Sequence, residues 1–222
     1  VGNHSGGATP PDMPILFTRW WRERGVDDPI YGLFHSMFIN LPGIGGMVKR
    51  AGAIEAGPKA TEAILRAGGN VVVYPGGDHE TYRPTWESSE IDFAGRQGFV
   101  RLALELGVRV VPVVAIGGQE TALFLGQGTR FAQALALDRL LRLKVFPVQV
   151  APPFGLTMLD LPGRIPLPAK IRTEFLDPIE VDHDPARLDD QDYVDKVYDE
   201  VQRASQAGMD RLATKRKFPV FG

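Results

Sequence analysis

The chain has 222 residues and a formal net charge of -2, with 44% hydrophobic and 23% charged residues. These values suit an ordinary globular domain, and without a basic excess we expect no nucleic-acid partner. The chain contains no cysteine, which excludes disulfides, thiolate nucleophiles and cysteine metal sites. No apolar run reaches the ~18 residues of a transmembrane helix.

Predicted strands and helices alternate along the chain. The opening VGNHS is typical of the end of a buried strand, so we expect an N-terminal segment to precede Val1. Helical patterns cover 14–25, 58–67, 95–107, 129–146 and 192–217. Short β-branched runs predict strands near Ala53 and within 70–77, 108–118 and 170–181. The alternation predicts an α/β fold, a single domain over residues 1–222 with a mostly parallel twisted sheet flanked by helices.

Two glycine-rich turns, GNHSGG at 2–7 and YPGGDHE at 74–80, follow predicted strands, where ligands bind in such sheets. The chain lacks Gly-x-Ser-x-Gly, a dinucleotide fingerprint and a His-Glu-x-x-His pattern, so we predict no metal site. His4 is a candidate general base, and Asp12 is the nearest acidic residue along the chain that could orient it. The alternative is structural: His4 caps the following helix and Asp12 is its N-cap.

Four strings in order resemble the glycerolipid acyltransferase superfamily, which includes lysophospholipid and glycerol-phosphate acyltransferases. They are NHSGGATPPD, with Asp12 eight positions after His4 instead of the family's usual shorter spacing, LPGIGGMVKRAGAI, YPGGDHE and GRQGFVRLALELGVRVVPVVAIGG. The third string is closer to the diacylglycerol acyltransferase branch, although His79 stands where that branch usually has arginine. The resemblance spans nearly the whole chain.

The resemblance implies a thioester donor, acyl-CoA or acyl carrier protein, which is a co-substrate and not a cofactor. The acceptor would be the hydroxyl of a lysophospholipid or related glyceride, which His4 would deprotonate. Backbone N–H groups of Gly76 and Gly77 could stabilise the oxyanion, or the turn could exist for its geometry alone. The remaining candidate substrate-binding residues are Lys49, His79, Glu80, Arg83 and Arg96; for Arg83 and Arg96 the alternative is ion pairing at the surface. Losing the usual arginine favours an acceptor with less charge than a phosphate monoester, and Glu80 would orient His79 or hold the loop.

The stretch FTRWWRERG suits a helix in the headgroup region of a bilayer, with Trp20 and Trp21 at the boundary. The alternative places one tryptophan in the core. We therefore expect a membrane protein that is peripheral or N-terminally anchored at the cytoplasmic face and acts as a lipid O-acyltransferase. Two other functions remain open: a lipid- or acyl-CoA-binding protein of the same fold without turnover, and a thioesterase.

Overall fold

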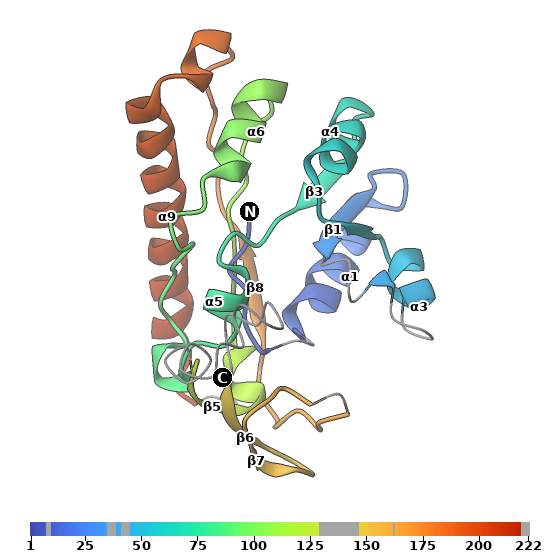
Figure 1. Ribbon diagram of the computed structural model, residues 1–222, viewed down its shortest axis with the longest axis vertical. Coiled ribbons are helices and arrows are strands. Elements are labelled where there is room, and N and C mark those ends of the chain that lie inside the picture. The colour runs from blue at the N-terminus through green and yellow to red at the C-terminus, as the bar shows by residue number, and fades with distance from the viewer. Residues whose placement is uncertain (8–9, 35–38, 41–44, 129–146, 162, 219–222) are drawn as a thin grey trace.

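The computed structural model describes residues 1–7, 10–34, 39–40, 45–128, 147–161 and 163–218 (Figure 1). The predicted helix over 129–146 and the start of the LPGIGGMVKRAGAI string lie outside these residues. In the described part of the chain, no helix is long and apolar enough to cross a bilayer.

The central strands are parallel except at one edge. One sheet has the order β2-β1-β3, with both pairs parallel, and a second pairs β4 with β8 antiparallel. The strands are β1 (Ile30–Phe34), β2 (Ala53–Glu55), β3 (Asn70–Val72), β4 (Val113–Ile116) and β8 (Arg172–Phe175). Residues 1–3 lie between the two sheets: the N–H of Gly2 donates to Val73 O at 2.9 Å, and that of Val113 donates to Val1 O at 2.8 Å. The first residues therefore join β3 to β4, as expected for the end of a buried strand.

Helices cover both sides of these strands (Figure 1). They are α1 (Asp12–Arg24), α3 (Gly45–Arg50), α4 (Pro58–Arg66), α5 (Gly77–Thr81), α6 (Gly98–Leu106) and α9 (Gln191–Thr214). The described residues also form the short 3₁₀ helices η1 (Thr85–Glu87), η2 (Gln119–Thr121) and η3 (Pro185–Leu188). Pro58 opens α4, and Gly107 ends α6 with a φ of +62°, a conformation that glycine adopts without strain.

The core forms where the apolar stripes of α6 and α9 meet β4. The fully buried residues there include Val100, Val114, Val194 and Val201. In a second cluster, Leu16 and Phe17 of α1 pack against β1 and β3. Burying such side chains contributes roughly 1.5–3 kcal/mol each. This packing fixes the sheet whose strand ends carry the predicted site.

The structure confirms the α/β class and corrects one part of the prediction. β8 runs antiparallel, and a separate antiparallel sheet with the order β5-β6-β7 forms one end of the molecule. Its strands are β5 (Leu123–Gly126), β6 (Val148–Ala151) and β7 (Gly155–Thr157). The sequence pattern missed this sheet because its strands, LFLG, VQVA and GLT, contain no run of β-branched residues like those that marked β3 and β4.

Candidate active site

The site lies where residues 1–3, β3 and β4 end side by side. Each strand is followed by a polar or glycine-rich loop: His4–Gly7 after the first, Tyr74 to α5 after the second, and Gly117 to η2 after the third. The N–H of Gly7 donates to Thr81 O, and the N–H of Gly6 donates to the Gln119 side chain at 3.1 Å. The predicted turns GNHSGG and YPGGDHE are thus brought together, with a third loop beside them.

His4 is held between packed groups. Its ring stacks on Tyr74 with the ring centres 5.0 Å apart. The residue keeps partial exposure, but its Nδ1 is buried and has no hydrogen-bond partner among the described residues. Burial lowers the pKa of His4 to about 4, and the positive charge of Arg83 adds to the effect. His4 is therefore neutral at pH 7, the state in which an imidazole can accept a proton.

Asp12 contacts the histidine loop at a different point. Its carboxylate accepts hydrogen bonds from the Ser5 hydroxyl at 3.1 Å and from the N–H of Met13 at 3.0 Å. In the described part of the chain, none of its hydrogen bonds reaches the His4 ring. Burial raises the pKa of Asp12 to about 7. The contacts make Asp12 a link between the loop and the first turn of α1, where it is the first helical residue and not the N-cap.

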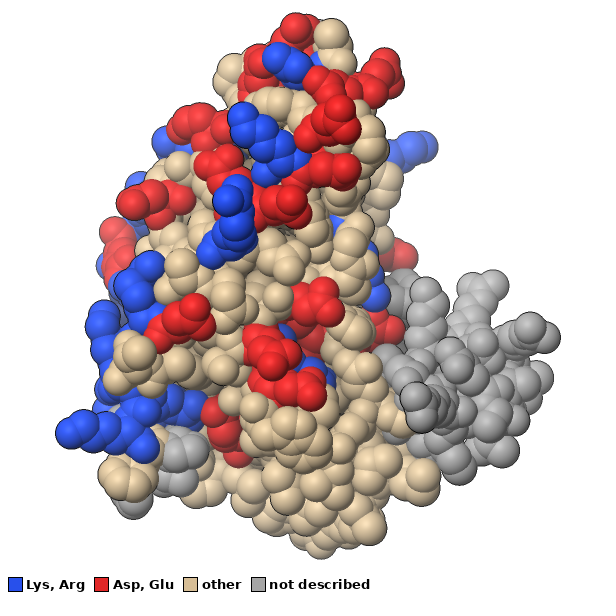
Figure 2. Space-filling model, turned by 90° about the vertical axis from the view of Figure 1, so that its left-hand side faces the viewer, with Lys and Arg blue, Asp and Glu red and all other residues tan. Residues whose placement is uncertain are grey.

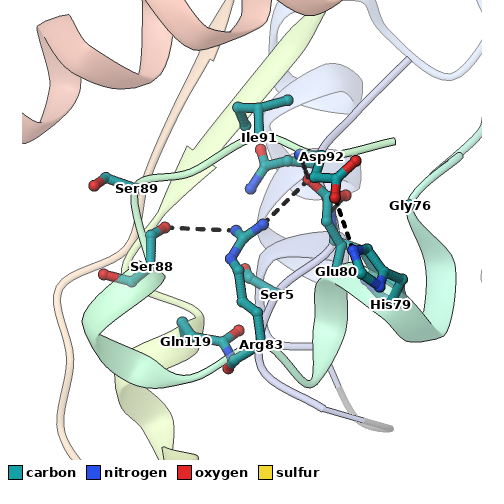
Figure 3. A network of polar contacts seen from close by, with 12 residues as sticks. Ser5, Gly76, His79, Glu80, Arg83, Ser88, Ser89, Ile91, Asp92 and Gln119 are labelled. Atoms are coloured by element: carbon teal, nitrogen blue, oxygen red, sulfur yellow. Dashed lines mark hydrogen bonds and ion pairs between the residues drawn. The ribbon is translucent and has the colours of Figure 1, made fainter. Parts of the chain in front are cut away.

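Glu80 ties three segments together from a buried position (Figure 3). Its Oε2 accepts the backbone N–H of His4 at 2.9 Å. Its Oε1 accepts Nη1 of Arg83 at 3.2 Å and the N–H of Asp92 at 3.3 Å. Burial raises the pKa of Glu80 to about 7, against the opposing effects of Arg83 and the two N–H groups. Of the two predicted roles for Glu80, these contacts match the one that holds the loop.

Arg83 and His79 are candidate headgroup-binding residues, but each side chain already has an acidic partner within the protein. Arg83 is buried, and besides Glu80 it donates to Ser88 O at 3.5 Å, so its charge is already paired. His79 is exposed, and its Nε2 lies 2.7 Å from Oδ2 of Asp92 (Figure 3). The structure thus assigns His79 a carboxylate partner, Asp92, that sequence reasoning missed.

The glycine turn uses one of its two proposed oxyanion donors internally. The N–H of Gly77 donates to Tyr74 O at 3.1 Å, and Gly77 has a φ of +49°. The Arg96 side chain binds the backbone of the turn, because its Nη1 donates to the carbonyls of Pro75 and Gly76 at 2.9 and 3.0 Å. The geometry of the turn therefore accounts for Gly77 without an oxyanion.

Arg96 and Lys49 do not converge on one anion site. Nη2 of Arg96 pairs with Asp78 at 2.7 Å, beside the turn. Lys49 is exposed in α3, next to β2, and β1 separates β2 from β3 (Figure 1). The structure brings together His4, Glu80 and Arg83 and leaves Lys49 away from them.

A cavity of about 310 Å³ opens beside α5 and η1. Its lining includes four carboxyl side chains and two basic ones: Glu80, Glu87, Glu90, Asp92, His79 and Arg83. His4 is not part of the lining; Glu80 lies between its backbone and the cavity. The excess of carboxylates disfavours an anionic headgroup here.

Two further residues that position the loops of the site lie outside the four sequence strings. Gln119 binds Gly6 and also donates to the carbonyl of Arg83, and Arg164 donates to the carbonyl of Gly6. Gln119 could have been found, because it is the first polar residue after the buried strand β4. Arg164 gave no signal, since its partner lies 158 positions away along the chain.

A family model described as diacylglycerol acyltransferase matches residues 38–201. The match includes α5, Glu80 and Arg96, and His4 and Asp12 precede it. The whole chain aligns with an uncharacterized protein of Mycobacterium leprae at 29% identity, and with uncharacterized proteins of Mycobacterium bovis and Mycobacterium tuberculosis at 28%. It spans only 58–59% of the length of these relatives. No solved structure matches.

Proposed function

Since the chain belongs to the diacylglycerol acyltransferase family, we propose that it transfers a fatty acyl group from a thioester to a glycerolipid hydroxyl. The donor is acyl-CoA or acyl carrier protein, and the acceptor is a diglyceride or a related lysolipid. The reaction takes place at a membrane surface, where such acceptors reside.

The neutral imidazole of His4 at the carboxyl edge of the strands carries this proposal. A buried ring nitrogen without a partner is costly, and an acceptor hydroxyl that donates to it would relieve the cost. His4 takes the hydroxyl proton while the oxygen attacks the thioester carbonyl. The tetrahedral intermediate then expels the thiolate, which receives the proton from His4, so no covalent enzyme intermediate forms. Base catalysis of this kind contributes roughly 10²–10⁴-fold.

The charge around α5 favours a neutral acceptor over a phosphate monoester. Arg83 is paired with Glu80, Arg96 with Asp78, and the adjacent cavity is rich in carboxylates. Among the described residues, a phosphate dianion would meet like charges there without a free arginine to bind it. Among the acceptors that the sequence predicts, a glyceride therefore fits better than a lysophosphatidic acid.

A second candidate, lipid binding without turnover, is favoured by one observation. Among the described residues, no carboxylate orients the His4 ring, whereas a catalytic base is usually oriented by a third group.

The test is an assay with radiolabelled acyl-CoA and a panel containing a diglyceride and lysophosphatidic acid. We expect product that depends on the diglyceride, and His4→Gln should lower its rate roughly 10²–10⁴-fold with unchanged thermal unfolding. The control is His183→Gln, at an exposed histidine, which should keep the full rate.

Three outcomes contradict the proposal. A His4→Gln variant that keeps most of its rate removes His4 from the mechanism. Free fatty acid released without acceptor indicates a thioesterase, and lipid binding without any product indicates the second candidate.

A further inference from the structure

Seven large apolar side chains are exposed around the small antiparallel sheet. Their exposed fractions lie between 40% and 66%. We call this surface the β5–β7 face: Leu123, Leu125, Phe154, Leu156, Met158, Leu159 and Ile165. Leu123 and Leu156 lie on the same side of this sheet, because both pair in register with Val150, and the N–H of Ile165 donates to Pro152 O beside it at 2.7 Å. Clusters of this kind on a protein surface mark an interaction site.

The segment that forms most of this face turns its charges inward. Asp160 and Arg164 are the only ionisable side chains in the sequence from Pro147 to Ala169. They pair at 2.9 Å, and each is only 4% exposed. Charged side chains normally face water and apolar ones the interior. Figure 2 shows the result, since the lower end of the visible surface carries neither acidic nor basic atoms.

Basic residues flank the face on one side. Arg216, just after α9, pairs with Glu120 of η2, which directly precedes β5, so the end of α9 lies beside the face. Lys215 and Lys217 on either side of Arg216 are exposed. Figure 2 shows Lys and Arg gathered on one flank above the uncharged end. Apolar side chains bordered by lysines are the combination that binds an anionic lipid surface.

We propose that the β5–β7 face docks on an anionic bilayer, with its apolar side chains at the boundary between headgroups and acyl chains. The predicted membrane helix is a weaker candidate. In α1, Trp20 packs on Phe175 with ring centres 5.9 Å apart and donates its Nε1–H to Asp28 O. Only Trp21 is left exposed of the two, at 38%. Together with Ile15, at 39%, α1 offers two large exposed apolar side chains, fewer than the seven of the face.

The face is also connected to the candidate active site. Arg164, whose guanidinium is 5.9 Å from the Phe124 ring centre beneath the face, donates to the carbonyl of Gly6, two residues after His4. Docking therefore places the His4 loop next to the bilayer, from which a glyceride could enter. Only this step rests on the proposed function; the docking itself does not.

The experiment is flotation with vesicles of phosphatidylcholine alone or with about 30% phosphatidylglycerol. We expect Leu156→Asp to lower vesicle binding about tenfold, as for the loss of one buried large side chain. Met47→Asp is the matched control, because Met47 in α3 has an exposed fraction of 65% against 66% for Leu156. It should bind as the wild type does. A Lys215→Glu/Lys217→Glu variant should bind anionic vesicles about tenfold more weakly and should bind phosphatidylcholine vesicles as the wild type does.

Equal binding by Leu156→Asp and Met47→Asp overturns the proposal. A wild-type chain that does not bind vesicles but dimerises through the β5–β7 face also overturns the proposal. Sedimentation velocity would then show a dimer that Leu156→Asp dissociates. Transfer to a water-soluble short-chain diglyceride should be unaffected by Leu156→Asp, whereas transfer to a vesicle-embedded diglyceride should fall. Flotation without any transfer would leave docking in place and count only against the proposed function.

Discussion

Replacing Gly76 by alanine should disrupt the Glu80 network without straining the backbone. Gly76 has φ -61° and ψ -31°, which any residue adopts. An added Cβ, however, would lie 2.6 Å from both Cγ and Cδ of Glu80, closer than real Cβ contacts. The Glu80 side chain would have to move by roughly half an ångström to reach even a tight contact. The substitution is therefore a local displacement of one buried carboxylate.

The magnitude follows from what Glu80 holds. It accepts from the N–H of His4, from Arg83 and from the N–H of Asp92 at 2.9, 3.2 and 3.3 Å. Loss of a buried ion pair that leaves one charge without a partner costs about 3–5 kcal/mol. Because Gly76→Ala displaces Glu80 without removing it, we expect this amount as the upper limit of the loss in free energy of unfolding. Misplacing the His4 loop should also reduce transfer on the order of 100-fold.

Urea denaturation of four proteins tests this reasoning: wild type, Gly76→Ala, Glu80→Ala and the double variant. Because Glu80→Ala removes the atoms that the new Cβ would meet, Gly76→Ala should cost less than about 1 kcal/mol in that background. Gly98→Ala is the control, since a Cβ at Gly98 meets nothing within 4 Å. If Gly76→Ala costs the same with and without Glu80, the overlap with Glu80 is not the cause and the reasoning fails.

The sequence predicts the elements whose patterns are long or have clear ends. The apolar stripe and Gly107 define α6, and a 24-residue amphipathic pattern defines α9. The buried apolar run at β4 and the Pro-Gly-Gly turn after β3 mark the ends of two strands. Because parallel strands end on the same side, the loops that follow them are predicted at one edge of the sheet. The site's location was therefore predictable.

The pairing of side chains within the site was not predictable, because it depends on packing between distant segments. Glu80 lies 76 positions from His4, and Arg164 lies 158 positions from Gly6. Proximity along the chain suggested Asp12 as the partner of His4, yet Asp12 contacts Ser5 and Met13. Burial of Arg83 likewise has no signal in a polar string such as ETYRP.

The two buried ionisable groups beside Ser5 lead to further predictions. The pKa of His4 is lowered to about 4, so between pH 6.5 and 4 the unfolded chain binds a proton there that the folded chain does not. The contribution of His4 to stability should fall over this range by up to about 3 kcal/mol, so in urea titrations the wild type should lose about 2 kcal/mol relative to His4→Gln between pH 7 and pH 5. The pKa of Asp12 is raised to about 7, which has the opposite sign: the folded chain keeps a proton that the unfolded chain releases, so stability is lost as pH rises towards 7. Asp12→Asn should therefore gain about 2.5 kcal/mol relative to wild type between pH 5 and pH 8, measured by the same titrations. Because Asp12 bonds to Ser5 and not to the imidazole, transfer by Asp12→Asn should stay within about tenfold of wild type, whereas a loss of the size expected for His4→Gln would show that the ionised carboxylate orients the base.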